Sequence, residues 1–313
     1  MQNEIKKMCF AEYGILVKSV SLLQDGSDNL VYQCQTDTTK YVLRISKKQK
    51  SDEDFLFETN LIKYLYDNGI PVAEPIYNNA HSFLTKYNEQ KMILFSFCDG
   101  EKIIFDKNSF PNEQQAYNAG IILAKIHNLT ENYTSPYKPS RTMISELKRI
   151  VENQREFEQK YENGTTFVAQ VYDILEGLDK CVRQNCIIHN DFRAQNLLFS
   201  QNKISAVLDF DWSCYGYPLK DLAHTMVEWS YPDGCLQPDV RIMHKILQGY
   251  ERFRAVSDKS ELKYWMCFSC LSDAATYFMD RLNPISEKKQ LRSYMYKKFL
   301  YFSTQDITQL PAE

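Results

Sequence analysis

Apolar side chains in the first hundred residues come in short runs, several of which alternate with polar positions as β-strands do. Valine, leucine and tyrosine supply most of these runs, and small polar stretches separate them. The strands predicted from this pattern span residues 14–23, 29–36, 40–45, 71–77 and 91–98. The N-terminal region is therefore expected to be rich in β-structure.

Apolar positions spaced by three and four residues predict helices in the remaining segments. In the N-terminal region, residues 51–68 show this spacing, begin at the capping residue Ser51 with acids in the first turn, and stop at Gly69. Beyond residue 98 the helical spacing dominates. The helices predicted there span residues 113–127, 143–161 and 167–184, and a proline-containing linker covers 133–141. This part of the chain is therefore expected to be mainly helical.

Three polar residues in the middle of the chain lie between short apolar runs. Asp191 and Asn196 are five residues apart, and Asp209 follows thirteen residues after the asparagine. The bracketing runs span residues 186–188, 197–199 and 206–208, as expected of buried strands that present catalytic loops. Phosphoryl transfer from ATP needs an aspartate that receives the acceptor proton, and an Asn/Asp pair that holds Mg²⁺ on the phosphates. We therefore predict that Asp191 is catalytic and that Asn196 and Asp209 bind the metal.

Bulk composition narrows the class of protein. The 313 residues suffice for two lobes with a substantial core, and contents of 44% hydrophobic and 25% charged residues are ordinary for a globular protein. The net charge of −3 provides no basic field for nucleic acid or an anionic membrane, so neither partner is expected. Composition leaves the oligomeric state open.

Cysteine use and hydropathy predict the compartment. The nine cysteines are an odd number at irregular spacing, and neither an early apolar run nor an uncharged stretch long enough for a membrane span is present. Reduced thiols in the cytoplasm are therefore expected. Cys267 and Cys270 form a lone pair in an apolar segment, which favours two buried side chains over half a zinc site.

The central motif resembles that of the aminoglycoside phosphotransferase / choline kinase superfamily. It reads His189-Asn190-Asp191, then Asn196, then Asp209-Phe210-Asp211 where protein kinases have Asp-Phe-Gly. The resemblance implies an α+β, protein-kinase-like fold with a β-rich N-lobe over 1–97 and a mainly helical C-lobe over 98–313. It also implies ATP and Mg²⁺ as cofactors and a small-molecule acceptor. In this fold His189 is structural and packs beneath the loop, leaving the chemistry to Asp191.

The same resemblance assigns a nucleotide-binding set to the N-terminal region. The polar loop between the first two strands fits the superfamily's Gly-x-x-Asn-x-x-Tyr pattern, although an ordinary hairpin turn explains it equally well. A strand cation reaches the phosphates, an acid on the next helix holds that cation, and the hinge offers its backbone to adenine. The residues in these roles are Gly26, Ser27 and Asn29 of the loop, Arg44, Glu58, and Ser96 and Cys98 of the hinge.

After the metal aspartate the chain is similar to choline and ethanolamine kinases. Their spacing continues to Asp221, and their Glu-Trp-x-Tyr is matched by Glu228-Trp229-x-Tyr231. Helical spacing places Asp221, Glu228 and Tyr231 on one face, where an acid and an aromatic ring suit a substrate cation. The expected acceptor-binding residues are Asp211, Glu228, Trp229 and Tyr231, and Asp221 is expected to be structural. Taken singly, each aromatic residue is better explained as part of the core, and each acid as a solvated side chain.

The function expected from these motifs is ATP-dependent phosphorylation of a hydroxyl on an amine-bearing small molecule, such as a choline- or ethanolamine-like amino alcohol or an aminoglycoside. Leu222-Ala223 departs from the choline-kinase pattern and is common in homoserine-kinase-like relatives, which makes a metabolite kinase of that type the alternative. A nucleotide-binding pseudokinase scaffold is a further alternative, but Asp191, Asn196 and Asp209 are all present. A protein kinase is disfavoured because no Ala-Pro-Glu sequence follows the metal motif.

Overall fold

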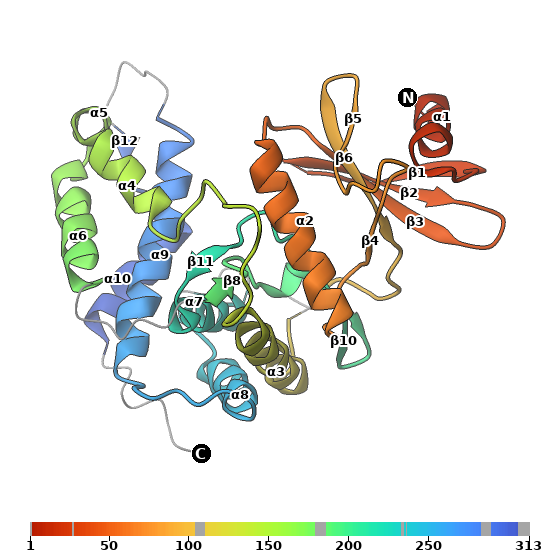
Figure 1. Ribbon diagram of the computed structural model, residues 1–313. Coiled ribbons are helices and arrows are strands. Elements are labelled where there is room, and N and C mark those ends of the chain that lie inside the picture. Colours follow the sequence, from red (N-terminus) through yellow and green to blue (C-terminus); the bar gives the residue numbers. More distant parts are fainter. Residues whose placement is uncertain are drawn as a thin grey trace. The chain divides into compact units, whose positions relative to one another are not determined.

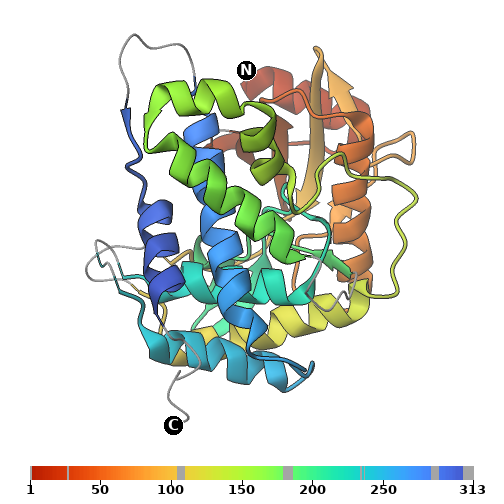
Figure 2. The same ribbon diagram turned by 90° about the vertical axis from the view of Figure 1, so that its left-hand side faces the viewer.

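The computed structural model divides into two compact units (Figures 1 and 2). The described residues are 2–26, 28–103, 110–178, 186–232, 235, 237–282 and 289–305. The N-terminal unit comprises 1–101, 134–140 and 197–211, and the C-terminal unit comprises 102–133, 141–196 and 212–313. The lobe boundary between 97 and 98 stays a prediction. The contacts within the chain group residues 197–211, which carry Asp209 and Asp211, with the N-terminal strands.

An antiparallel sheet forms the centre of the N-terminal unit, with strand order β1-β2-β3-β6-β4 and β5 paired to β6. The strands are β1 (Ser19–Asp25), β2 (Asn29–Gln35), β3 (Lys40–Ser46), β4 (Pro75–Ile76), β5 (Thr85–Tyr87) and β6 (Gln90–Ser96). The predicted strand over 14–23 begins only at Ser19, because Gly14 has a φ of +68° and ends a preceding helix. The strand predicted over 71–77 is reduced to β4, because Pro71 and Pro75 have no N–H to donate to a ladder.

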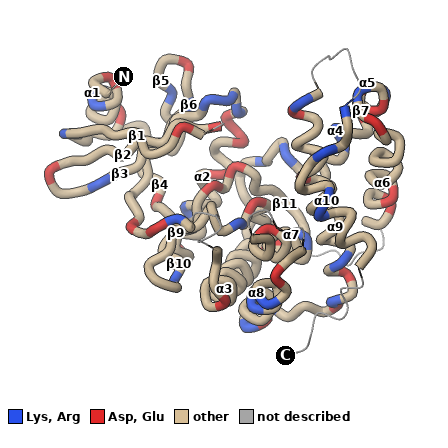
Figure 3. Tube along the Cα trace, turned by 180° about the vertical axis from the view of Figure 1, so that it is seen from behind, with Lys and Arg blue, Asp and Glu red and all other residues tan. Residues whose placement is uncertain are grey.

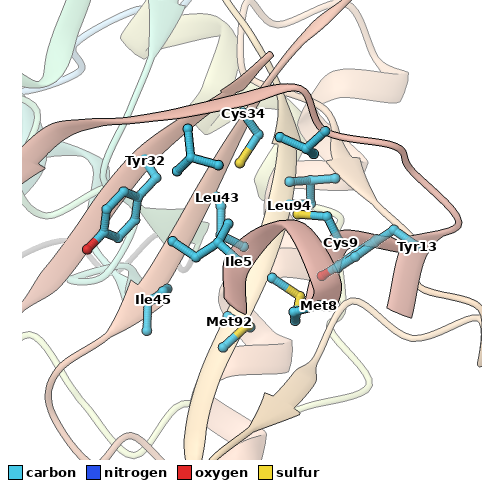
Figure 4. Packing of buried hydrophobic residues seen from close by; sticks show 12 residues of the cluster. Ile5, Met8, Cys9, Tyr13, Tyr32, Cys34, Leu43, Ile45, Met92 and Leu94 are labelled. Atoms are coloured by element: carbon cyan, nitrogen blue, oxygen red, sulfur yellow. The ribbon is translucent and has the colours of Figure 1, made fainter. Parts of the chain in front are cut away.

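Helix α1 (Gln2–Tyr13), which adds to the predicted elements, covers one region of this sheet. Its residues Ile5, Met8 and Cys9 recur at helical spacing and are buried. They pack in one cluster with sheet residues that include Cys34 and Leu94 (Figure 4). The apolar face of α1 therefore builds the core of the N-terminal unit on the sheet.

Helix α2 (Asp52–Asp67) begins and ends as predicted. The Ser51 hydroxyl accepts a hydrogen bond from the Asp54 N–H at 2.9 Å, and three acids occupy the first turn. Gly69 follows the helix with a φ of +77°. This helix carries Glu58 on a buried position, so its capping signals fix where that carboxylate can lie.

The hairpin of β9 (Leu197–Ser200) and β10 (Lys203–Val207) belongs to the N-terminal unit and leads to Asp209. Single bridges pair Val207 with Val72 and Phe199 with Glu101. Gly100 allows this approach, because a Cβ at its position would lie 2.3 Å from the Ser205 Oγ, and its φ is +151°. The strands predicted around the metal motif are confirmed.

The C-terminal unit is mainly helical, and with the β-rich N-terminal unit it confirms the predicted α+β class. Its helices are α3 (Glu113–Thr130), α4 (Ser145–Glu152), α5 (Gln154–Lys160), α6 (Gly164–Gly177), α7 (Pro218–Ser230), α8 (Val240–Glu251), α9 (Glu261–Met279) and α10 (Tyr294–Thr304). Two short strand pairs accompany them: β7 (Tyr161–Glu162) with β12 (Lys289–Gln290), and β8 (Cys186–Ile188) with β11 (Cys214–Gly216).

Two of the helical predictions need correction. The helix predicted over 143–161 is two helices, because the chain leaves helical geometry at Asn153, where ψ is +24°. The helix predicted over 167–184 begins at Gly164, and its described part ends at Gly177. The packing of α3 against α8 depends on glycine: a Cβ at Gly249 would lie 1.9 Å from the Tyr117 carbonyl oxygen.

No helix in the described ranges is long and apolar enough to cross a lipid bilayer.

Candidate active site

The backbone of the catalytic loop is anchored by a buried carboxylate. Strand β8 leads directly into His189, and the backbone N–H groups of His189 and Asn190 donate to the two oxygens of Asp221 at 2.8 and 2.9 Å. Asn190 has a φ of +64°, so the chain turns sharply at this point. The loop geometry thus depends on one side chain from α7, the residue predicted to be structural.

Asp221 remains charged although it is fully buried. Burial works against the carboxylate, but the hydrogen bond from His127 and the positive charge of Lys220 lower the pKa of Asp221 to about 2. His127 lies 3.1 Å from it through Nε2 and contacts the Tyr250 hydroxyl through Nδ1 at 2.8 Å. Burial lowers the pKa of His127, so the ring is neutral near pH 7. Tyr250, His127 and Asp221 therefore form a hydrogen-bonded network, and the charge of Asp221 strengthens its bonds to the loop backbone.

Asp191 and Asn196 meet within this loop. The Asp191 Oδ2 accepts hydrogen bonds from the Asn196 Nδ2 at 2.8 Å and from the Arg193 Nη2 at 2.9 Å. The same Asn196 nitrogen donates to the Asp191 carbonyl at 3.0 Å, which directs the amide oxygen to the opposite side of the group. Burial raises the pKa of Asp191, and the charges of Arg193, His224 and His189 partly oppose this rise.

Two further residues support the loop from inside the C-terminal unit. The His189 ring is buried, its Nδ1 accepts the Asp191 N–H at 3.3 Å, and it makes a T-shaped contact with the Phe192 ring. The indole Nε1–H of Trp229 donates to the Phe192 carbonyl at 3.0 Å, and the Trp229 side chain is completely buried. Both side chains therefore hold loop backbone; the structural role of His189 and the acceptor contact of Trp229 stay predictions.

A second group of charges, here called the N-terminal charge cluster, consists of Asn29, Arg44, Lys50, Glu58 and Asp211. The two terminal nitrogens of Arg44 contact the two oxygens of Glu58 at 2.5 and 2.9 Å. The Lys50 ammonium lies 2.8 Å from Glu58 and 3.0 Å from Asp211. Asn29 donates to the other Asp211 oxygen at 2.7 Å. Two cations and two carboxylates are thus joined across β2, β3, α2 and the segment after β10 (Figure 3 colours these charges along the trace).

The charges in this cluster stabilise one another against burial. Burial opposes the charge on Arg44, but Glu58 and Asp211 outweigh it and raise the pKa of the guanidinium. Burial also opposes the charge on Asp211, whose pKa is nevertheless held well below its usual range by Arg44 and Lys50. The Arg44 Nε is buried and has no hydrogen-bond partner among the described residues, which fits an anionic oxygen such as that of a phosphate.

Lys50 is the member of this cluster that sequence analysis missed. It ends the polar run Lys47-Lys48-Gln49-Lys50, in which no periodicity distinguishes one lysine from the others. Asp211 was expected on the acceptor side, but its described partners are Asn29, Arg44 and Lys50 of the N-terminal unit.

The oxygen donors expected to bind metal suit magnesium rather than zinc. Within the described ranges, no group of three or more His, Cys, Asp and Glu side chains is arranged to hold a metal ion. Mg²⁺ is characteristically held by one or two protein oxygens together with phosphates and water. Asp209, directly after Leu208, has a φ of +65°, a backbone conformation that is rare outside glycine and clusters at functional sites. Its charge also acts on Arg44.

The remaining nucleotide-binding candidates lie on the edges of the N-terminal sheet. Gly26 closes the β1–β2 turn by donating its N–H to the Asn29 carbonyl at 3.0 Å. Ser96 ends β6, where its hydroxyl accepts the Glu74 N–H at 2.8 Å. Cys98 follows as a half-buried free thiol. Ser27 lies outside the described residues.

The acid and aromatic ring expected to receive a substrate cation both contact Lys298. Glu228 pairs with the Lys298 ammonium at 2.8 Å, and that ammonium lies 4.7 Å from the Tyr231 ring centroid. Tyr231 falls just beyond α7, with a ψ of 104°, so the expected helical face ends at Ser230. Sequence analysis missed Lys298, which comes from α10 and lies seventy residues from Glu228.

Comparisons with known proteins agree with this architecture. The model of the phosphotransferase enzyme family (APH) matches residues 19–256. Homoserine kinase from Bartonella tribocorum is 23% identical over 245 residues, covering 74% of this chain and 71% of the relative. Homoserine kinase from Methylobacillus flagellatus is 24% identical over 273 residues, covering 84% and 79%. These identities are low, and the relatives span most of the chain.

Two solved structures show the same fold. The amicoumacin kinase hAmiN in complex with AMP-PNP, Ca²⁺ and Ami has a TM-score of 0.74 at 17% identity, covering 96% of this chain and 91% of that one. The microcompartment-associated aminopropanol kinase has a TM-score of 0.68 at 16% identity, covering 96% and 94%. The predicted protein-kinase-like fold is confirmed, and from the extent of the family match the chain belongs to the phosphotransferase enzyme family.

Proposed function

We propose that this phosphotransferase transfers the terminal phosphoryl group of ATP to a hydroxyl of a small molecule that carries an amine. The observation that carries the proposal is the Asp191–Asn196 hydrogen bond of 2.8 Å in a loop anchored by Asp221. This bond joins Asp191, which is suited to receive a proton, to Asn196, which is suited to hold a metal ion. Membership of the phosphotransferase family supports phosphoryl transfer as the reaction.

Asp191 is the proposed catalytic residue. It orients the acceptor hydroxyl and takes its proton as the new P–O bond forms, while the bond between the terminal phosphorus of ATP and the bridging oxygen breaks and ADP leaves. Its pKa, raised by burial, makes the carboxylate a better proton acceptor than an exposed aspartate. Asn196 keeps Asp191 aimed by donating to both its carbonyl and its carboxylate.

The nucleotide side is assigned to the N-terminal charge cluster and its neighbours. Arg44, held by Glu58, has an unpartnered Nε–H to offer a phosphate oxygen. Gly26 and Asn29 would approach the phosphates from the β1–β2 turn, and Ser96 and Cys98 would present backbone to adenine. We place Asp211 here as well, as the residue that orients Arg44 and Lys50. The hAmiN complex holds AMP-PNP, which supports ATP as donor.

Asn196 and Asp209 are the proposed Mg²⁺ ligands. When bound, the metal neutralises charge on the transferring phosphates. Asn196 offers its amide oxygen, because the amide nitrogen is already used within the loop. Asp209 offers a carboxylate on a backbone turned to positive φ. The hAmiN complex also holds Ca²⁺, which supports the use of a divalent cation.

An amine on the acceptor is supported by the names of relatives, because homoserine and aminopropanol both combine an amine with a hydroxyl. In this proposal the Glu-Trp-x-Tyr residues do not contact the acceptor directly. Glu228 and Tyr231 act through Lys298, and Trp229 acts through the loop backbone that it holds. A homoserine-kinase-like metabolite kinase remains the nearest alternative substrate class. A pseudokinase scaffold is opposed by the complete set of Asp191, Asn196 and Asp209.

Acceptor-dependent ADP release tests the proposal. Choline, ethanolamine, L-homoserine, aminopropanol, spectinomycin and kanamycin are each added with MgATP to the wild type and to Asp191→Asn. We expect at least one acceptor to stimulate ADP release in the wild type and to lose this effect in the variant. MgATP binding without Asp191-dependent turnover of any amine would instead indicate a scaffold.

A further inference from the structure

The site expected to attract a substrate ammonium already holds an ammonium of the protein. We call the residues around it the Lys298 cage: Glu228, Tyr231 and Tyr294. The Lys298 Nζ pairs with Glu228 at 2.8 Å and lies 4.7 and 4.9 Å from the ring centroids of Tyr231 and Tyr294. The side chains of Lys298 and Glu228 are only 4% and 9% exposed. An acceptor amine would have to displace a buried ion pair here, so we expect it to bind elsewhere.

The charges that remain accessible near Asp191 are of both signs. Arg193 leaves 41% of its side chain exposed, and Asp273 on α9 leaves 32%. Arg193 has five N–H donors, and its described hydrogen bond uses one of them, to Asp191. The negative charges of Asp191, Glu228 and Asp273 all raise the pKa of Arg193. These four charged groups therefore interact electrostatically. One accessible cation and one accessible acid therefore accompany the catalytic carboxylate.

His224 adds a second donor of positive charge. Its Nε2 lies 3.1 Å from the Asp273 Oδ2, whereas its Nδ1 is buried and has no hydrogen-bond partner in the part of the chain that the structure describes. Burial opposes charge on the ring, but Asp273 outweighs it and raises the pKa of His224, so Nδ1 carries a proton when the ring is charged. A buried donor without a partner is costly unless a ligand satisfies it. A positive charge on His224 also lowers the pKa of Asp191, as the charge of Arg193 does.

We propose that the acceptor is a small hydroxy amino acid, whose carboxylate is bound by Arg193 and His224 and whose ammonium is bound by Asp273. This inference rests on the proposed function, in which Asp191 receives the proton of the acceptor hydroxyl. Arg193 supplies one charged donor, and the Nδ1 of His224 supplies a second donor when the ring is protonated, an arrangement suited to a carboxylate. Asp273 has an oxygen beyond the one that contacts His224, and its partial exposure leaves it accessible to an ammonium. An amino alcohol without a carboxylate would leave Arg193 and His224 unsatisfied.

Four acceptors that differ only in charged groups test the inference. L-Homoserine carries both charges, 3-aminopropan-1-ol lacks the carboxylate, 4-hydroxybutyrate lacks the ammonium, and propan-1-ol lacks both. In the wild type we expect kcat/KM for homoserine to exceed that for each singly charged analogue by about 10- to 150-fold, the range typical of a charged hydrogen bond. Choline is included to test the Lys298 cage, and we expect it to be a poor acceptor.

Two variants that each remove one charge then locate the charges. Arg193→Gln should collapse the ratio of kcat/KM between homoserine and 3-aminopropan-1-ol, whatever its effect on turnover. Asp273→Asn should instead collapse the ratio between homoserine and 4-hydroxybutyrate. The matched control is Arg241→Gln on α8, which removes an exposed arginine paired with Asp239 and should leave both ratios unchanged. Arg193→Lys, which keeps the charge, should restore part of the first ratio, provided that its melting temperature matches the wild type.

Each alternative result has a distinct meaning. An equal loss of kcat/KM for all four acceptors in Arg193→Gln would overturn the inference and place Arg193 on the transferring phosphate. Preference of the wild type for 3-aminopropan-1-ol or choline over homoserine would also overturn it. Asp191-dependent phosphorylation of a larger amine, with homoserine inactive, would reject the hydroxy amino acid and leave the proposed function standing. Failure of every acceptor would reject the proposed function itself and the inference with it.

Discussion

The two groups of charges in this protein are built in opposite ways. In the N-terminal charge cluster, Arg44 and Lys50 share Glu58 and Asp211, and none of these four side chains is more than 20% exposed. Around Asp191, the pairs Arg193–Asp191 and His224–Asp273 each leave one member partly exposed, Arg193 at 41% and Asp273 at 32%. The first group is closed on itself, whereas the second keeps charges available to a ligand.

This difference corresponds to what each side has to do. The nucleotide presents the same phosphates in every reaction of this type, so a rigid set of cations oriented by buried carboxylates suffices. The acceptor distinguishes one small-molecule kinase from another, and specificity for charged groups requires side chains that a ligand can reach. The comparison therefore predicts that substitutions in the N-terminal charge cluster act on stability and nucleotide binding, and those near Asp191 act on turnover and selectivity.

The largest effect is expected at Asp191. Asp191→Asn preserves size but removes the proton acceptor, so turnover should fall by about 10²- to 10⁴-fold. Nucleotide binding should persist, because the side chain contacts only Arg193 and Asn196 among its described polar side-chain partners. Steady-state ADP release and thermal stabilisation by MgATP measure the two properties separately. A variant as active as the wild type would remove Asp191 from the mechanism.

Glu58→Gln tests whether the N-terminal charge cluster is closed. The change leaves two buried cations with one carboxylate, so the free energy of unfolding should fall by about 3–5 kcal/mol. Asp67→Asn on the same helix is the matched control, because it removes an exposed carboxylate paired with Lys63 and should cost less than about 1 kcal/mol. Urea denaturation measures both variants. Equal losses would show that burial does not distinguish the two ion pairs.

Glu228→Gln extends the comparison to the Lys298 cage. Leaving the Lys298 ammonium buried without its carboxylate should lower the free energy of unfolding by about 2–3 kcal/mol. Adding Lys298→Met should recover part of that loss, because the unpaired charge is then gone. Lys298→Met is also measured alone. If it destabilises Glu228→Gln by as much as it destabilises the wild type, the two side chains are not coupled.

Local patterns in the sequence were enough to predict much of the fold and to propose the centre of the site. Asp191, Asn196 and Asp209 are recognisable because their roles depend on short spacings between buried strands. The limits of α2 follow from Ser51 and Gly69, which act on their immediate neighbours. Arg44 and Glu58 required the family resemblance, because an arginine on a strand and a glutamate on a helix have no local signature of pairing.

What could not be predicted depends on pairings over long sequence separations. Lys50 reaches Asp211 across 161 residues, and Lys298 reaches Glu228 across 70. Neither lysine differs in pattern from its neighbours, so only the fold reveals that each is buried against an acid. Trp229 was similarly ambiguous: its spacing suited a cation site, but its indole is enclosed and holds the Phe192 carbonyl. The composition of the acceptor side was therefore beyond the reach of periodicity.

The smallest expected effect is a shift in pH dependence that separates the charge of Arg193 from its contact with a substrate. Burial raises the pKa of Asp191, and Arg193 is the foremost charge that opposes this rise. Because Asp191 acts in its ionised form, kcat/KM should fall as the pH drops through that pKa. Arg193→Gln removes the opposing charge, so the pKa of Asp191 should rise further and the acid limb should move to higher pH.

His189 and His224, whose charges also act on Asp191, are retained in both enzymes and cannot cause a difference between them. Arg241→Gln again serves as control, because it removes an exposed arginine on α8 whose described partner is Asp239 and should leave the limb where it is. Profiles of kcat/KM with 3-aminopropan-1-ol are the decisive measurement, since that acceptor has no carboxylate for Arg193 to bind. A limb that stays in place or moves to lower pH would show that Arg193 does not act on the ionisation of Asp191, and would separate its part in selectivity from any part in proton transfer.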